Sequence, residues 1–577
     1  MMDRRVLLAI FLCFFVLYFW NVLVIKPAPK SVPGGSTPTA PSAASGVREP
    51  SPSPASEAVV PTPRAEPGTP PLVGETTERD VRVETRDVIA TFTNRGARLK
   101  SWRLKRYLDQ NKQPQELIFN QLDSQPLPFT LQVADKQTSA LMNGALYAID
   151  RTSGSSSAAA GPIHLRFEYR IEEPAIHVVK EFDVQAEGYI VAFGASVMTT
   201  QVEPYAILWG PAVGDIGEIS RYTQKAEGLL FQGTNAQRLS PKDFAKQSLY
   251  EGDFSYAGVD DNYFMTAALS LAATKVRYQP VSIPPPANSK DPARDFVAYS
   301  LEAPPTSAPI KFFIGPKDFD VLAAINSDMT RAINFGMFAI IVVPLLQSLK
   351  WVHNYAGNYG WSIVILTVMI NAIMFPLRHK SAVSMRKVQE IQPEVKSIQE
   401  RYSKLKTTDP ARQKMNQELM ALYREKGVNP AGGCVPMLLT MPVFLAMWAL
   451  LQTSIELRGA PWFGWIHDLS SYDRYYVLPV IMVASQFWQQ RMMPAAGADP
   501  AQQKMMMFMP AVMGFIFLWL PAGALIYYVI SNFWMIGQQY VTNRLLGPPN
   551  VRRSRPAAER QTKRVGSGKT EAAARES

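Results

Sequence analysis

The chain is poor in the residues from which catalytic and metal sites are usually built. It has 577 residues but only 2 cysteines and 5 histidines. Cys13 and Cys434 lie far apart and neither belongs to a CxxC pair, so we expect no structural disulfide and no cysteine metal site. No paired carboxylates, catalytic triad or metal cluster can be recognised in the long middle part of the chain. The sequence therefore predicts no catalytic residue, no metal and no cofactor.

Acidic residues and histidine are also missing from the middle of the long apolar runs after Ala332. Proton relays and ion sites inside a membrane need such residues, so their absence argues against a pump or an ion-coupled transporter. The net charge of +11 is concentrated between Arg378 and Lys426 and in the tail after Arg544. A basic balance of this kind favours anionic lipid or RNA as a neighbour.

Residues 1–25 predict an uncleaved transmembrane anchor with its N-terminus inside the cell. The basic start MMDRR precedes about twenty apolar residues, which is enough to cross a bilayer. The run ends in the large residues Tyr18, Phe19 and Trp20, whereas a cleaved signal peptide, the alternative, ends in small residues. Residues 26–80 are dense in Pro, Ser, Ala and Thr and predict a disordered linker.

Residues 81–320 predict a large all-β domain on the outer side of the membrane. Short runs such as IHLRFEYRI, VVKEFDV and YIVAFGASV alternate in polarity and are rich in β-branched and aromatic residues. The apolar runs that follow are long enough for helices that cross a membrane. The predicted fold class is therefore a polytopic α-helical membrane protein with a large all-β domain.

Charge bias and the number of crossings together predict six transmembrane helices. The basic stretch 378–428 should face the cytoplasm, so only one crossing can separate it from the β domain. Of the two apolar runs in between, 332–356 contains Pro344 and carries Lys350 and Trp351, which favours an amphipathic helix at the membrane interface. The spans predicted after the anchor are 361–377, 431–453, 475–491, 505–520 and 522–541, with a periplasmic loop at 454–474 and a basic cytoplasmic tail at 543–577.

Two of these spans are short for a hydrocarbon core about 30 Å thick. Segments 361–377 and 505–520 hold about 17 and 16 residues, which predicts local thinning of the bilayer. Segment boundaries that are wrong by a few residues are the alternative explanation.

The basic stretch 378–428 predicts a cytoplasmic helical hairpin. Apolar residues recur every three or four positions from Met385 to Leu405, which is typical of one helical stripe. Asp409 and Pro410 predict a second helix start, and that helix should end near Gly427. A basic hairpin is a natural docking arm, although a solvated hairpin without a partner is the alternative. The candidate docking residues are Arg378, Lys380, Arg386, Lys387, Arg401 and Lys404.

Polar side chains recur within the predicted spans at helical spacing. Thr367 and Asn371 lie four residues apart and therefore on one face of a helix. An isolated amide exposed to lipid is costly, so such groups should face one another or a wet cavity. Four spans carry them, which favours a hydrated interior groove over hydrogen bonds that only hold helices together. The candidate groove residues are Thr367, Asn371, Thr440, Gln452, Gln486, Tyr528, Ser531 and Asn532.

Four long segments carry a resemblance to a known family. They are WVHNYAGNYGWSIVILT (351–367), NPAGGCVPMLLTMPVFLAMWALL (429–451), SIELRGAPWFGWIHDLSSYDRYYVLP (454–479) and DPAQQKMMMFMPAVMGFIFLWLPAGALIYYVISNFW (499–534). The region 331–545 closely resembles the YidC family of membrane protein insertases, and the anchor with its β domain resembles the Gram-negative form. The resemblance implies a periplasmic β-supersandwich and five core helices around a hydrophilic groove, in the bacterial inner membrane.

The resemblance also implies a function and partners. The chain would insert and chaperone nascent membrane proteins, alone or with the Sec translocon, and receive them from the ribosome and the targeting machinery. It would not be an enzyme. The tail 543–577 carries nine basic and three acidic residues, so ribosomal RNA or anionic lipid would be its contact. A small-solute transporter and a membrane-anchored periplasmic carbohydrate-active protein are the alternatives.

One position departs from the family pattern. The segment NAIMFPL aligns with RGIMYPL in the family, so Asn371 occupies the groove position of an arginine. Thr367 and Tyr528 match other groove positions. Arg378 lies two turns further along the same helix, about 10 Å away, and is the candidate to substitute for the missing charge.

Overall fold

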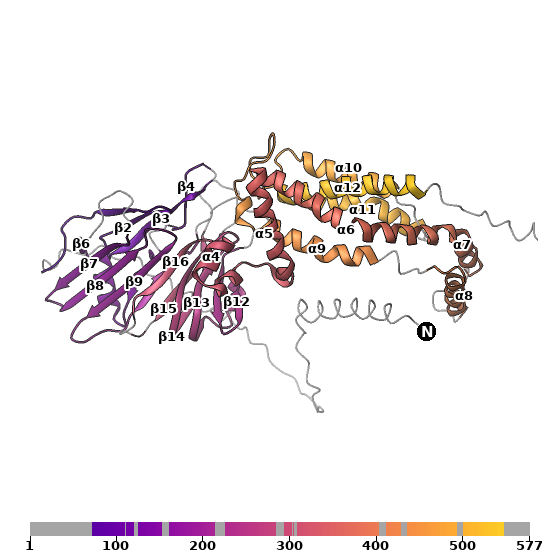
Figure 1. The fold of residues 1–577 in the computed structure, drawn as a ribbon. Coiled ribbons are helices and arrows are strands. Elements are labelled where there is room, and N and C mark those ends of the chain that lie inside the picture. The colour runs from indigo at the N-terminus through magenta and orange to yellow at the C-terminus, as the bar shows by residue number, and fades with distance from the viewer. Residues whose placement is uncertain are drawn as a thin grey trace, which may run out of the picture.

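A computed structural model describes two parts of the chain, a β domain and a set of long helices, which lie end to end (Figure 1). The described residues are 72–109, 111–119, 125–152, 161–213, 225–283, 294–302, 304, 308–402, 411–428, 435–492 and 500–546. The predicted anchor 1–25, most of the linker 26–80, the segment with Lys404, Asp409 and Pro410, and the tail beyond Leu546 lie outside these residues.

The β domain contains two antiparallel sheets. The smaller sheet has the order β1 (Asp80–Glu84), β2 (Val88–Thr93), β3 (Arg98–Leu108) and β4 (Pro114–Glu116). The larger sheet of 12 strands has the order β12-β11-β13-β14-β16-β9-β8-β7-β6, and β15, β10 and β5 branch from it at β14. Its strands are β5 (Thr130–Gln132), β6 (Ala148–Thr152), β7 (Ile163–Ile171), β8 (Ile176–Val184), β9 (Ile190–Met198), β10 (Ala206–Trp209), β11 (Glu227–Gln232), β12 (Asn235–Leu239), β13 (Leu249–Asp260), β14 (Phe264–Ile283), β15 (Arg294–Glu302) and β16 (Ile310–Pro316).

Side chains from both sheets fill a common core between them. The ring centroids of Phe92 in β2 and Phe182 in β8 are 4.8 Å apart. Trp102 of β3 donates from Nε1 to the carbonyl of Ile314 in β16 across 2.8 Å. Both contacts join the small sheet to the large one. The predicted β-rich class of this domain is therefore confirmed.

Short helices also occur among the described residues of this domain. Three short helices interrupt it, α2 (Lys136–Gly144), α3 (Pro241–Phe244) and α4 (Phe319–Ile325). The side chains of Asp135 and Asp318 accept hydrogen bonds from the first backbone amides of α2 and α4. Capping of this kind stabilises helices that are too short to show an apolar stripe in the sequence.

The helical part begins after two short 3₁₀ turns, η1 (Ser327–Ala332) and η2 (Gly336–Phe338). Five long helices run along one another, and the interface helix predicted at 332–356 corresponds to α5, which lies across their end beside the β domain (Figure 1). Two shorter helices lie at the opposite end. The helices are α5 (Ala339–Ala356), α6 (Tyr359–Glu390), α7 (Gln392–Arg401), α8 (Ala411–Glu425), α9 (Val435–Thr453), α10 (Val477–Met492), α11 (Pro500–Phe517) and α12 (Ala522–Leu546), with a 3₁₀ turn η4 (Ile455–Leu457) after α9.

The helix that contains the predicted span 361–377 is longer than that span. It continues without a break past Pro376 and Arg378 and ends at Glu390. Lysine and arginine end an apolar run, but they are good helix formers and do not end a helix. The first part of the predicted basic hairpin is therefore an extension of α6.

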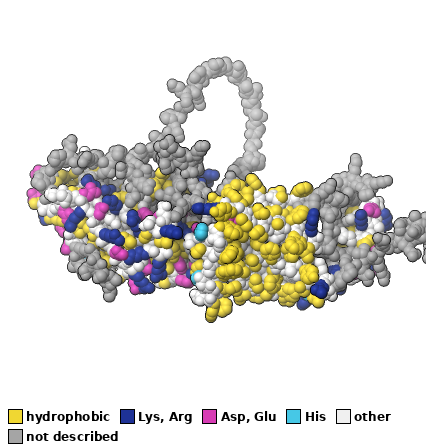
Figure 2. Space-filling model, turned by 90° about the horizontal axis from the view of Figure 1, so that it is seen from above, with side chains coloured by type: hydrophobic (Ala, Val, Ile, Leu, Met, Phe, Trp, Pro, Cys, Tyr) yellow, Lys and Arg dark blue, Asp and Glu magenta, His cyan; other side chains and the backbone are white. Residues whose placement is uncertain are grey.

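The face of the helical part seen in Figure 2 is a broad apolar band with basic side chains at its two ends. Large side chains such as Ile340, Ile373, Val480 and Phe515 are exposed on it. Among the described residues, two helices, Gly336–Ala356 and Tyr359–Val388, are long and apolar enough to cross a membrane. Two further apolar stretches among the described residues, Thr440–Thr453 and Phe508–Phe517, are shorter, α10 has 16 residues, and the predicted anchor lies outside the described part of the chain.

Candidate functional site

Asn371 is buried where α6 packs against α12. Its side-chain nitrogen donates to the carbonyl of Thr367 across 2.8 Å and to the hydroxyl of Ser531 across 3.4 Å. Thr367, which is fully buried, donates to the carbonyl of Ile363 across 2.6 Å. The structure therefore brings together three of the predicted groove residues, Thr367, Asn371 and Ser531. We call the polar side chains between α6, α10 and α12 the polar seam.

Arg378 reaches back along α6 to the polar seam. Its Nη1 donates to the side-chain oxygen of Asn371 across 2.6 Å, and the residue is half-buried. Seven residues of helix correspond to about 10 Å of rise, a distance that the long arginine side chain covers. The sequence names Arg378 both as a docking residue of the hairpin and as the candidate to substitute for the missing charge, and the structure places its guanidinium beside Asn371. A positive charge thus lies next to the amide in the position where the family pattern has arginine.

A second polar contact joins α10 to α12. Asn532 donates to the hydroxyl of Ser485 across 3.1 Å, and Ser485 donates to the carbonyl of Met482 across 2.8 Å. One turn further on, Gln489 donates to the sulfur of Met535 across 3.2 Å. Ser485 was not among the candidate groove residues. Its spacing from Gln489, four residues along one helix, is the signal that could have included it.

The remaining candidates lie in different surroundings. The ring of Tyr528 is 4.9 Å from Phe444 of α9 and 5.2 Å from Phe517 of α11, so Tyr528 contacts two further helices. Thr440 is half-buried on α9. Gln452 lies in the last turn of α9, where its carbonyl accepts a hydrogen bond from Asn262 of the β domain. This contact involves only the backbone of Gln452, so the place of its side chain in the groove stays a prediction.

Several buried polar atoms on α10 and α12 have no hydrogen-bond partner among the described residues. They are Gln486 Oε1, Trp534 Nε1, Gln538 Oε1 and Thr542 Oγ1. A buried polar atom without a protein partner costs about 1–3 kcal/mol, and water is the usual partner in that case. Trp534, Gln538 and Thr542 are four residues apart and therefore lie on one face of α12, and the predicted groove residue Gln486 directly follows Ser485 on α10.

The hairpin has its own small core at the end of the molecule opposite the β domain (Figure 1). Ile391, Val395 and Ile398 pack with Leu422 and Val428. The ion pair of Arg401 with Glu418, 3.0 Å long, joins α7 to α8, so this docking candidate is engaged within the hairpin. Lys380 and Lys387 are exposed and Arg386 is half-buried. The helix α8 ends before Gly427, which has φ +62°, as the sequence predicts.

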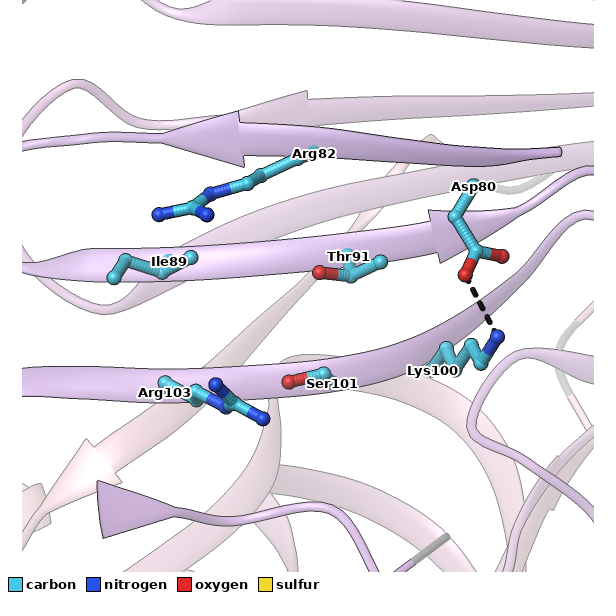
Figure 3. A pocket seen from close by; sticks show the side chains of 7 residues that line it. All are labelled: Asp80, Arg82, Ile89, Thr91, Lys100, Ser101 and Arg103. Carbon is cyan, nitrogen blue, oxygen red and sulfur yellow. Dashed lines mark hydrogen bonds and ion pairs between the residues drawn. The ribbon is translucent and has the colours of Figure 1, made fainter. Parts of the chain in front are cut away.

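A depression on the outer face of the small sheet is another place where polar side chains gather (Figure 3). Its charged residues are already paired: Lys100 with Asp80 at 2.7 Å, Arg82 with Glu84, and Arg103 with Glu116. In the part of the chain that the structure describes, no group of three His, Cys, Asp or Glu could hold a metal ion. The polar seam is therefore the better candidate site.

Two family models match consecutive parts of the chain and define the class of protein. Residues 80–348 match the YidC periplasmic domain, and residues 351–548 match the 60Kd inner membrane protein. A "Membrane protein insertase YidC" of Pelobacter propionicus is 31% identical over 576 residues, covering 94% of this chain and 100% of that protein. The chain therefore belongs to the YidC family of inner-membrane proteins with a periplasmic β domain.

Comparison with solved structures also finds proteins that match parts of this chain. The crystal structure of an active YidC insertase with its first transmembrane domain is 17% identical, with a TM-score of 0.33, and covers 82% of this chain and 95% of that one. A galactose mutarotase-like protein of Lactobacillus casei is 9% identical, with a TM-score of 0.27, and covers 41% of this chain and 100% of that one. Membership in the family rests on the sequence matches.

Proposed function

We propose that this chain is a membrane protein insertase and chaperone, and not an enzyme. It inserts and folds nascent inner-membrane proteins, alone or with the Sec translocon. The single observation that carries the proposal is the contact of Arg378 and Ser531 with the buried Asn371, within helices that expose large apolar side chains. Burying a cation and an amide inside such a set of helices costs free energy unless they bind a polar ligand or water.

The mechanism follows from the cost of moving polar groups through lipid. A polar segment of the substrate that lies along the polar seam exchanges water for the hydroxyls and amides of α6, α10 and α12, and therefore crosses at lower cost. The 16 residues of α10 span about 24 Å, less than the ~30 Å hydrocarbon core, so the bilayer thins around the protein. The apolar helix of the substrate then partitions into lipid, which drives insertion without a nucleotide.

The proposed topology has six transmembrane helices, of which α6, α9, α10, α11 and α12 form the core. The anchor 1–25 is the sixth, both termini are cytoplasmic, and the β domain is a periplasmic supersandwich. Two features of α5 support its place at the outer interface. Trp351 and Tyr355 are exposed, and Lys350 forms ion pairs with Asp320 and Glu456 at 2.8 and 2.7 Å. Amphipathic aromatic residues and ion pairs are typical of the boundary between lipid and water.

The proposed partners bind on the cytoplasmic side. The exposed Lys380 and Lys387, with Arg386, lie on the extension of α6 toward the hairpin, where the ribosome and the targeting machinery would dock. The basic tail after Arg544 would contact ribosomal RNA or anionic lipid by charge. These assignments rest on charge and on family membership.

Photocrosslinking tests the proposal. A photoreactive residue at position Thr367, Asn371 or Tyr528 should crosslink to a stalled nascent membrane protein, whereas one at Leu141, exposed on the β domain, should not. Depletion of the chain in its own cells should also reduce integration of inner-membrane proteins. Unimpaired integration together with no crosslink from the three positions would refute the insertase and favour a transporter or a carbohydrate-active protein.

A further inference from the structure

The outer end of α9 is capped by a side chain of the β domain. The last four carbonyls of a helix lack partners within the helix. One of them, the carbonyl of Gln452, accepts a hydrogen bond of 3.0 Å from the side-chain nitrogen of Asn262. The donor lies 190 residues earlier, in the turn between β13 and β14. A residue of one part of the molecule thus completes a helix of the other part.

The turn that carries Asn262 is itself held rigidly. The carboxylate of Asp261 accepts hydrogen bonds from the backbone amides of Tyr263 and Phe264 at 2.8 and 2.7 Å. The buried ammonium of Lys317 donates to Asp260 across 2.8 Å and to the carbonyl of Asp261 across 2.6 Å. Because these groups are buried and hydrogen-bonded to one another, the turn holds the side chain of Asn262 in place without help from α9.

Arg458 makes a second connection five residues after the end of α9. Its guanidinium donates to the carbonyl of Leu108 across 3.0 Å and to the side chain of Gln115 across 2.7 Å. It also lies 5.0 Å from the ring centroid of Phe264, a distance typical of a cation–π contact. Leu108 and Phe264 belong to different sheets, so Arg458 fixes this segment to both sheets of the β domain.

The position of this helix end affects the helices of the polar seam through aromatic contacts. One face of α9 carries Phe444 and Trp448, whose rings contact Tyr528 and Phe517. A tilt of α9 about its outer end would therefore move Phe444 away from Tyr528. We propose that Asn262 and Arg458 are positioning residues, which brace α9 from the periplasmic side and set its distance from α12. This inference rests on the proposed function, and it makes the β domain a brace of the core.

Hydrogen exchange of the full chain in lipid nanodiscs tests the brace directly. Asn262→Leu and Arg458→Gln each remove donors from the brace, and Arg82→Ala, on the outer face of the small sheet, is the matched control. We expect each brace variant to speed amide exchange in residues 449–457 by about tenfold, as the loss of one helix-end hydrogen bond implies. Exchange in α10 should not change, and Arg82→Ala should change neither.

Insertion assays then separate positioning from mere stability. The brace variants should lower insertion several-fold, and Arg458→Lys, which keeps one cation, should recover part of it. Unchanged exchange in 449–457, equally faster exchange in α10, or faster exchange with normal insertion would each overturn the inference. A failure of the proposed function itself differs, because the wild-type chain would then give no crosslinks from Thr367 or Tyr528.

Discussion

Arg378 donates a hydrogen bond of 2.6 Å to the side-chain oxygen of Asn371, although seven residues of α6 separate them. The amide nitrogen of Asn371 faces Ser531 of α12 at the same time. Asn371 thus joins the cation of one helix turn to the hydroxyl of a neighbouring helix. The family pattern has an arginine at this position. In this chain an amide occupies the position, and the more distant Arg378 brings a positive charge beside it.

Replacement of Arg378 should affect substrates according to their charge. Arg378→Gln removes the positive charge, and its shorter side chain also gives up the hydrogen bond to Asn371. We expect insertion of a substrate with an acidic translocated tail to fall about tenfold, since a hydrogen bond to a charged group contributes ~1.5–3 kcal/mol. The same substrate with a neutral tail should insert normally. Rates are measured by protease protection of the tail in vesicles.

The double variant Arg378→Gln with Asn371→Arg is the control for this prediction. It returns one cation to the polar seam at the family position and should recover insertion of the acidic tail. An equal loss for both tails, or no gain from Asn371→Arg, would show that charge at this site is unimportant in this protein.

The contact of Ser485 with Asn532 provides a test of whether the polar seam accommodates polar substrate segments or only holds the helices together. Hydrogen bonds between membrane helices contribute only about 0.6 kcal/mol on average, so Asn532→Leu should lower the melting temperature by few degrees. If the polar seam shelters polar substrate segments, insertion should fall several-fold in this variant. Melting in detergent and insertion are measured on the same preparation. If insertion falls only in proportion to stability, the hydrogen bond only holds α10 and α12 together.

Gly360 should not tolerate a side chain. A Cβ at this position would overlap the indole ring of Trp462, which lies against the start of α6. We expect Gly360→Ala to destabilise the outer end of the core by about 1–3 kcal/mol, as overpacking usually does. Gly537→Ala in α12 is the control, because no atom lies near its Cβ and alanine is the better helix former. Equal melting temperatures for the two variants would contradict the prediction.

Much of the helical part could be predicted because apolar runs and helices share the same limits there. The predicted span 475–491 corresponds to α10 (Val477–Met492), and the span 522–541 starts where α12 starts. The four-residue spacing of Thr367 and Asn371 also predicts their shared face, and their hydrogen bond follows from it. Local sequence determines these features, so a single sequence is enough to find them.

Features that depend on the packing of distant segments could not be predicted in this way. The cap of α9 by Asn262 is such a feature, because it joins residues 190 positions apart. The alternation of inward and outward side chains in β8, by contrast, does predict a buried lysine. Val178, Lys180 and Phe182 occupy successive inward positions, so the pattern VVKEF places a lysine in the core.

The buried Lys180 makes the stability of the β domain depend on pH. Its ammonium donates to the carbonyls of Gly96, Ala97 and Phe129 at 2.6, 3.3 and 2.8 Å, so that all three of its hydrogens have acceptors. Burial, and secondarily the charge of Arg98, nevertheless lowers the pKa of Lys180 well below its ordinary value of 10.5. Between the lowered pKa and 10.5 the unfolded chain binds more protons than the folded chain. The free energy of unfolding therefore rises with pH in this window.

Lys180→Met removes this titration and leaves three carbonyls without a donor. We expect the variant to be less stable by about 3 kcal/mol, since each unsatisfied buried acceptor costs ~1–3 kcal/mol and part of that is recovered by packing. Its stability should also lose the rise with pH. Thermal unfolding of the full chain in detergent, followed by tryptophan fluorescence at pH 7.5 and 9.5, measures both effects. A variant whose stability rises with pH as steeply as that of the wild type would show that another group titrates in this window.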